Sequence, residues 1–267
     1  MKKSILLSLV LVAGLSFYAQ SATVDTIDTH STVMNKTVKA AVILPDDYAE
    51  TQAYPVVYLL HGYNGHYKRW LEIAPDIKYF SDLYKMIIVC PDAKNSWYWD
   101  SPVNPESMYE TYIAKELVEQ IDSIYRTINN PAGRAITGFS MGGHGALYLA
   151  LKHQDLFGAG GSISGCVDTR NYHQHWEIKD LLNTERRDEY SIMGMLDVLS
   201  PDSLALIIDC GTNDFFYQDH VALHEKLSSK QISHDFISRS GNHNDKYFAN
   251  AIRYQLLFMD IYFKGKY

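Results

Sequence analysis

Short apolar runs alternate with amphipathic stretches along most of the chain. The runs cover residues 33–44, 54–60, 86–90, 135–139, 161–164, 204–209 and 234–238, and their length predicts strands. Two other stretches carry apolar stripes at helical spacing: Ile113, Leu117, Ile121 and Ile124 in the first, and Phe248, Ile252, Leu256, Met259 and Phe263 in the second. Apolar strands that alternate with such helices indicate an α/β fold, in which helices cover both faces of a mostly parallel central sheet.

The length and the composition suit a single domain. The chain has 267 residues, of which 46% are hydrophobic, and this is enough for one full core. No repeat, low-complexity tract or linker interrupts the alternation of strands and helices. We therefore expect one domain over residues 22–267, with a small variable insertion near residues 167–199.

The N-terminus has the pattern of a secretion signal. Lys2 and Lys3 precede an apolar run over residues 5–15, and the small residues Ala19 and Ser21 stand before a plausible cleavage point. The run is too short to span a membrane. The sequence therefore predicts a signal peptide over residues 1–21 and a mature protein that is periplasmic or extracellular, with a cytosolic N-terminus as the alternative.

Charge and ligand spacing argue against several kinds of function. The formal charge of −7 and the lack of a basic run argue against nucleic-acid binding. Cys90, Cys166 and Cys210 have no metal-ligand spacing, and their odd number leaves at least one thiol unpaired, while a disulfide between the other two stays open. His173 and His175 have no Cys, Asp or Glu at ligand spacing. We expect no metal and no organic cofactor.

Residues 134–145, RAITGFSMGGHG, are the most informative stretch. They read as a short strand, a sharp turn that carries Ser140, and the start of a helix, which is the G-x-S-x-G pattern of a nucleophile elbow. Gly138 and Gly142 have no Cβ, so the strand and the helix can approach closely around a strained serine. The alternative is a glycine-rich turn that only packs.

A carboxylate and an imidazole follow Ser140 in the order Ser, Asp, His. Asp214 lies past a glycine turn after one predicted strand, and His243 lies in a loop after the next. A serine hydroxyl needs an imidazole to take its proton, and the imidazole needs a carboxylate to fix its tautomer. Asp209 is the alternative acid, but it lies inside the strand. His144 is the alternative base, but it follows on the helix, where we expect it to pack.

Six stretches carry a resemblance to a known family. They are residues 58–65 (YLLHGYNG), 96–101 (SWYWDS), 138–147 (GFSMGGHGAL), 161–165 (GSISG, preceded by Phe157), 209–214 (DCGTND) and 241–243 (GNH). In these stretches the chain resembles the esterase family of α/β-hydrolases that includes feruloyl esterases, acetyl xylan esterases, S-formylglutathione hydrolases (esterase D) and the mycolyltransferases of the antigen 85 type. The match runs through most of the chain beyond residue 21 and implies the α/β-hydrolase fold.

The resemblance also implies an oxyanion hole. Acyl transfer needs two N–H groups that converge on one oxygen. One comes from the residue after the nucleophile, Met141. The resemblance assigns the other to the backbone of Tyr63, with Gly62 as the alternative donor. An ordinary turn at the end of the strand is the alternative interpretation of His61 and Gly62.

Aromatic residues are candidates for the walls of a substrate pocket. Trp97 and Trp99 lie in a polar loop, Trp176 lies in the insertion, and Tyr63 lies in the oxyanion loop. Aromatic rings near a cleft stack on sugar or aryl rings, and core packing is the alternative. Trp70 is expected in the core.

The sequence thus predicts a secreted serine carboxylic-ester hydrolase that works through Ser140, His243, Asp214 and an acyl-enzyme. The expected substrates are feruloyl or acetyl esters of plant polysaccharides. A generic short-chain carboxylesterase for small-molecule esters, or an acyltransferase, is the alternative among enzymes. An inactive carbohydrate-binding or interaction module is the alternative class, and the three intact residues argue against it. The sequence does not indicate the oligomeric state.

Overall fold

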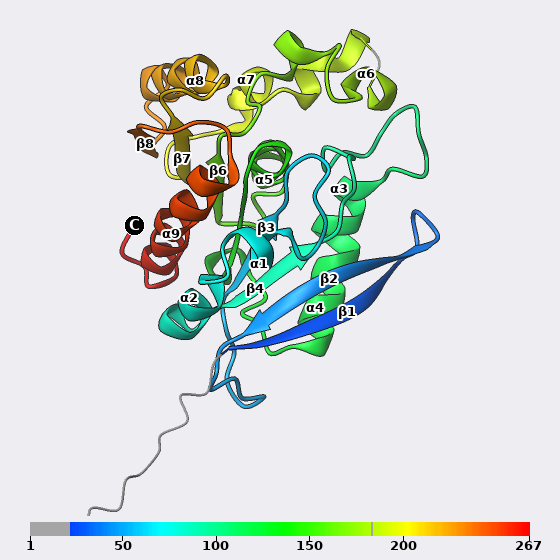
Figure 1. The fold of residues 1–267 in the computed structure, drawn as a ribbon, viewed down its shortest axis with the longest axis vertical. Coiled ribbons are helices and arrows are strands. Elements are labelled where there is room, and N and C mark those ends of the chain that lie inside the picture. Colours follow the sequence, from blue (N-terminus) through cyan, green and yellow to red (C-terminus); the bar gives the residue numbers. More distant parts are fainter. Residues whose placement is uncertain (1–21, 183) are drawn as a thin grey trace, which may run out of the picture.

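A computed structural model describes residues 22–182 and 184–267, so the signal peptide predicted for residues 1–21 lies outside the described residues. They form one eight-stranded sheet in the order β1-β2-β4-β3-β5-β6-β7-β8 (Figure 1). The strands are β1 (Thr23–Ser31), β2 (Lys36–Leu44), β3 (Val56–Leu60), β4 (Ile87–Pro91), β5 (Arg134–Gly138), β6 (Ala159–Ile163), β7 (Ala205–Gly211) and β8 (Asp235–Arg239). Strands β3 to β8 pair in parallel, whereas β1 and β2 pair antiparallel. The predicted mostly parallel sheet is confirmed.

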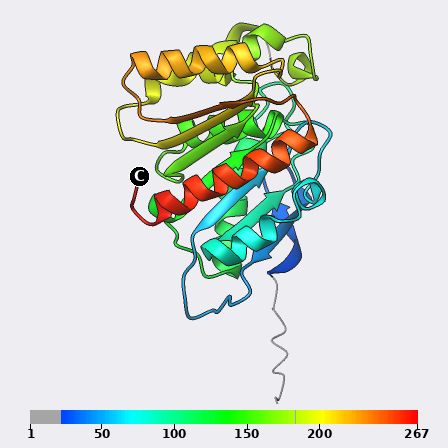
Figure 2. The ribbon, with the colours of Figure 1, turned by 60° about the vertical axis from the view of Figure 1, so that its left-hand side comes forward.

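Helices cover both faces of the sheet. One face packs against α1 (Arg69–Ile73), α2 (Ile77–Tyr84) and α9 (Asp245–Phe263), and Figure 2 shows α2 and α9 lying across it. The other face packs against α5 (Met141–Lys152), α8 (Tyr217–Ser229) and a continuous helix made of α3 (Tyr109–Thr111), a π-helical segment (Tyr112–Leu117) and α4 (Val118–Ile124). Each face therefore has its own hydrophobic core. None of the helices within the described ranges is both long and apolar enough to cross a bilayer.

The sequence pattern differs from the structure at three points. The hydrophobic pattern misses β1, because most of its residues are exposed, and residues 32–35 form the turn to β2 rather than the start of a strand. Ile124 was expected on a buried stripe but is 55% exposed. Beyond the π-helical segment Val118, Ile121 and Tyr125 face the core, and Ile124, the last residue of α4, faces the solvent.

The segment between β6 and β7, which contains the expected insertion, folds into short helices that include α6 (Ile178–Leu181) and α7 (Ile192–Met195). Hydrogen bonds tie this segment to the loop that carries the predicted tryptophans. Ser101 Oγ donates to the carbonyl of Leu181 at 2.6 Å, and the hydroxyl of Tyr190 donates to the carbonyl of Asp100 at 3.2 Å.

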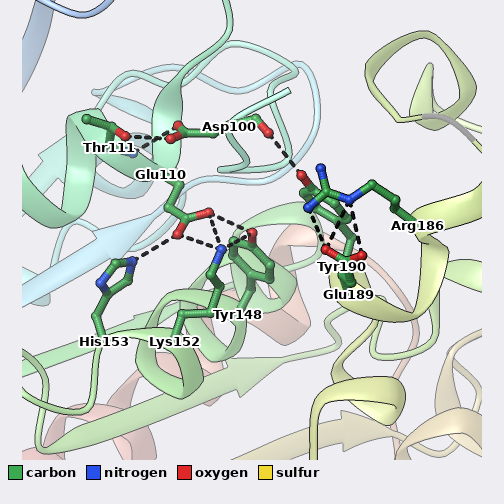
Figure 3. A network of polar contacts seen from close by, with 9 residues as sticks. All are labelled: Asp100, Glu110, Thr111, Tyr148, Lys152, His153, Arg186, Glu189 and Tyr190. Carbon is green, nitrogen blue, oxygen red and sulfur yellow. Dashed lines mark hydrogen bonds and ion pairs between the residues drawn. The ribbon is translucent and has the colours of Figure 1, made fainter. Parts of the chain in front are cut away.

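Glu110 lies at the centre of a polar network that anchors this arrangement (Figure 3). Its carboxylate accepts hydrogen bonds from Tyr148 (2.6 Å), Lys152 (2.8 Å) and His153 (3.1 Å). The ring of Tyr148 stacks on that of Tyr190, with centroids 5.8 Å apart. Burial opposes ionisation of Glu110, but the hydrogen bonds from His153, Lys152 and Tyr148 outweigh it and lower the pKa of Glu110 to about 2. The network therefore joins α3, α5 and the segment between β6 and β7.

We predict that Glu110→Gln lowers the free energy of unfolding by about 1–3 kcal/mol, because it leaves the buried hydroxyl of Tyr148 without its charged acceptor. The pKa of Glu110 is lower in the folded chain than its ordinary value of 4.5, so its stabilising effect is complete above pH 4.5 and fades as the pH falls toward 2. Denaturant unfolding at pH 7 and pH 3 measures both effects. The exposed ion pair of Arg186 and Glu189 supplies the control, since Glu189→Gln should leave the unfolding midpoint unchanged. A difference between wild type and Glu110→Gln that grows on acidification would contradict the prediction.

Candidate active site

Three loops at one edge of the sheet bring Ser140, Asp214 and His243 together. Ser140 follows β5, Asp214 follows β7 and His243 follows β8. The carboxyl ends of parallel strands lie at the same edge, so residues far apart in the sequence meet there.

The turn that holds Ser140 is strained and closely packed. Ser140 has φ 55° and ψ −122°, a backbone conformation that residues with a side chain rarely adopt, and α5 begins directly after it. A Cβ on Gly142 would lie 2.5 Å from the carbonyl oxygens of both Leu60 and His61. Only glycine fits at this position, so the elbow packs backbone to backbone against the end of β3.

The side chains of Ser140, His243 and Asp214 form a continuous hydrogen-bonded line. His243 Nε2 lies 2.9 Å from Ser140 Oγ, and His243 Nδ1 lies 2.8 Å from Asp214 Oδ2. Because the carboxylate accepts from Nδ1–H, Nε2 is left to accept from the serine hydroxyl. The Asp214 side chain is fully buried, which favours its neutral form, but hydrogen bonds from His243 and the N–H of Phe216 outweigh burial and lower its pKa.

Asp209, the alternative acid, has other partners. Its two carboxylate oxygens accept from Arg239 Nη2 and from the hydroxyl of Tyr247, each at 2.5 Å. The structure therefore pairs Asp214, and not Asp209, with His243.

Two backbone N–H groups near Ser140 are available for a developing oxyanion. Met141 and Tyr63 both line the pocket that contains Ser140. No acceptor within residues 22–182 and 184–267 takes the N–H of either residue. This is consistent with the assignment made from the family resemblance.

His61 shapes the loop that carries Tyr63. Its Nε2 accepts from the N–H of Ala93 at 2.9 Å, so Nδ1 carries the proton and donates to the carbonyl of Gly62 at 2.8 Å. Burial lowers the pKa of His61 to about 4, which keeps the ring neutral at pH 7. His61 thus holds the loop that carries Tyr63 from its buried side.

A pocket of about 220 Å³ opens over Ser140 and is walled by aromatic rings. Its lining residues are Tyr63, Trp97, Ser140, Met141, Trp176, Phe215, Phe216 and His243. Trp97 Nε1 donates to the carbonyl of Trp176 at 3.1 Å, so the two tryptophan walls are bonded to each other. The sequence reasoning missed Phe215 and Phe216, although they directly follow Asp214, and Phe215 lies 4.4 Å from the ring centre of His243.

Trp99 was expected in the pocket wall, and the structure corrects this. It is fully buried, stacks behind Trp97 and donates from Nε1 to Nε2 of His144 at 2.9 Å. His144 Nδ1 in turn donates to the carbonyl of Cys166 at 2.8 Å, and burial lowers the pKa of His144 to about 4. Trp99 and His144 therefore support the pocket from the core, as expected for His144.

Neither a metal centre nor a disulfide is found in the part of the chain that the structure describes. No group of three or more His, Cys, Asp or Glu side chains there could hold a metal ion, and this includes the region of His173 and His175. Cys90, Cys166 and Cys210 are all buried and unpaired.

The fold and the site are those of an α/β-hydrolase. A family model described as "Putative esterase" matches residues 31–259, so the chain belongs to this esterase family. The resemblance found in the sequence is thereby confirmed, and the protein is a serine carboxylic-ester hydrolase.

Individual relatives agree with this assignment. The chain is 25% identical to an acetyl esterase of Caldicellulosiruptor saccharolyticus in an alignment 257 positions long, which covers 85% of this chain and 96% of that protein. A solved ferulic acid esterase superposes with a TM-score of 0.79 at 27% identity, covering 91% of this chain and 98% of the other. The serine hydrolase FphF of Staphylococcus aureus superposes with a TM-score of 0.81 at 24% identity over 90% of this chain and 98% of its own.

We predict that Trp99→Phe destabilises the fold by about 1–3 kcal/mol, because it leaves the buried Nε2 of His144 without its donor. Since Trp99 does not touch the pocket, kcat/KM for p-nitrophenyl acetate at 25 °C should stay at the wild-type value. Thermal unfolding and steady-state kinetics measure the two quantities. If the melting temperature is unchanged and kcat/KM falls only for aryl esters, Trp99 is a pocket residue and the correction is wrong.

Proposed function

We propose that the protein is an exported esterase that cleaves feruloyl or acetyl esters of plant polysaccharides through Ser140, His243 and Asp214. The observation that carries the catalytic assignment is the hydrogen-bonded line from Ser140 Oγ through His243 to the buried carboxylate of Asp214. Export rests on the signal pattern of residues 1–21.

The geometry supports acyl transfer in two steps. Ser140 Oγ attacks the ester carbonyl while His243 Nε2 takes its proton, and Asp214 stabilises the resulting imidazolium. The N–H groups of Met141 and Tyr63 stabilise the oxyanion. His243 then gives the proton to the leaving alcohol. Water then gives a proton to the same imidazole and attacks the acyl carbon, and Ser140 Oγ leaves as it takes that proton back from His243, which releases the acid.

The shape and lining of the pocket favour an acyl group that is small or flat. A volume of about 220 Å³ bounded by aromatic rings suits an acetyl or a single aryl unit better than a long alkyl chain. The acetyl esterase of Caldicellulosiruptor saccharolyticus and the solved ferulic acid esterase, which resemble this chain, favour the same two acyl groups. We propose a polysaccharide as the alcohol part of the ester because the signal pattern indicates export and because of these two relatives.

We predict that Ser140→Ala and His243→Ala each lower kcat for p-nitrophenyl acetate by about 10⁴-fold or more, with a smaller loss for Asp214→Asn. Each substitution removes a group from the line without adding bulk. Circular dichroism and thermal unfolding check that the variants keep the fold. Turnover by Ser140→Ala above a tenth of the wild-type value would rule out Ser140 as the nucleophile.

We predict that Trp176→Ala lowers kcat/KM for methyl ferulate by about three- to tenfold, because a ring–ring contact contributes roughly 0.5–1.5 kcal/mol beyond the area it buries. The value for p-nitrophenyl acetate should not change, because the acetyl group is too small to reach this wall. Tyr79→Ala is the matched control, since Tyr79 is 60% exposed on α2 and away from the pocket. Equal losses on both esters would show that Trp176 maintains the fold and does not bind the acyl group.

A further inference from the structure

Asp209 connects the strand before Asp214 to both ends of the loop that carries His243. The carboxylate is fully buried on β7. Oδ2 accepts from Arg239 Nη2, and Arg239 is the last residue of β8, just before the loop. Oδ1 accepts from the hydroxyl of Tyr247, which lies in the first turn of α9, just after the loop.

The His243 loop packs directly against the Asp209 partners, Arg239 and Tyr247. The guanidinium of Arg239 lies 5.2 Å from the ring centre of Tyr247, so the two donors also contact each other. A Cβ on Gly241 would lie 2.1 Å from Cδ2 of Tyr247, which shows that the ring presses directly on the loop two residues before His243.

Two backbone hydrogen bonds join the His243 loop to the loop that carries Asp214. The N–H of Thr212 donates to the carbonyl of Arg239, and the N–H of Asn213 donates to the carbonyl of Gly241, both at 2.9 Å. A shift of the His243 loop would therefore change the distance between His243 and Asp214 as well as the distance between His243 and Ser140.

We propose that Asp209 is a positioning residue, which holds His243 in line with Ser140 and Asp214 by clamping Arg239 and Tyr247 at the two ends of its loop. This inference rests on the proposed role of His243. Asp209 touches neither the pocket nor the reacting atoms, so its effect on the reaction passes entirely through the loop.

The test compares Asp209→Asn with wild type at pH 8. Burial raises the pKa of Asp209 to about 6, against the hydrogen bond from Tyr247 and the charge of Arg239, so the carboxylate is ionised at the assay pH. We expect kcat for p-nitrophenyl acetate to fall about 10- to 100-fold, because a displacement of about 1 Å in a catalytic group has that cost. KM should stay within about twofold, since the pocket walls are unaltered.

A fluorophosphonate probe gives a second readout that depends on the Ser140–His243 pair but not on the natural ester. Its rate of reaction with Ser140 should fall by the same factor as kcat. Tyr247→Phe, which removes one end of the clamp, should give a smaller loss of the same kind. The losses of the two single variants should not add in the double variant, because both act through one loop.

Asp122→Asn is the matched control. Asp122 pairs with the buried Arg134 at 2.8 Å at the start of β5, the opposite edge of the sheet from the site. The Asp122→Asn substitution should lower the melting temperature, while kcat and the rate of reaction with the probe at 25 °C stay at wild-type values. If Asp209→Asn lowers only the melting temperature, or if Tyr247→Phe keeps the wild-type kcat and probe rate, the positioning role is wrong. If His243→Ala also keeps wild-type activity, the proposed function itself has failed, and the two failures are thereby distinguished.

Discussion

The close approach of two backbones at Gly142 is the constraint on which the rest of the site depends. The carbonyls of Leu60 and His61 leave no room for a side chain there, so β3 and the start of α5 are locked together. This contact holds Ser140 in its strained conformation and brings the loop after β3, with Tyr63, over the same pocket. One packing contact therefore fixes the positions of the serine and of the second oxyanion donor at once.

The sequence was sufficient for the features that are local or follow from sheet geometry. The elbow at Ser140 is recognisable because glycine spacing and strain are properties of neighbouring residues. Asp214 and His243 could be predicted as partners of Ser140, although they lie far from it in the sequence, because each follows a strand and parallel strands end at a common edge. The preference for Asp214 over Asp209 had the same origin, since a residue past the strand end lies in a loop whereas one within the strand points into the core.

Features that depend on a loop's path or on contacts between distant segments could not be read in this way. Trp97 and Trp99 are two residues apart in one polar loop and both are buried, yet only Trp97 lines the pocket. Left-handed backbone at Trp97 (φ 58°) and Tyr98 (φ 63°) turns the chain between them, and neither is glycine, so the sequence carries no sign of the turn. Phe215 lines the pocket because its ring stacks on that of Trp176, which belongs to a distant segment of the chain, and the sequence gives no sign of this contact.

The hydrogen bond from Trp97 Nε1 to the carbonyl of Trp176 has a consequence for how the pocket could be re-engineered. The two pocket walls come from segments about eighty residues apart, and because the acceptor is a backbone carbonyl, the bond depends on the backbone path of the segment between β6 and β7 and not on the side chain at position 176. A graft of the segment between β6 and β7 that changes this backbone path would leave the indole N–H of Trp97 without its acceptor unless the loop after β4 is transferred with it. A redesign of the acyl pocket should therefore treat the two segments as one structural unit.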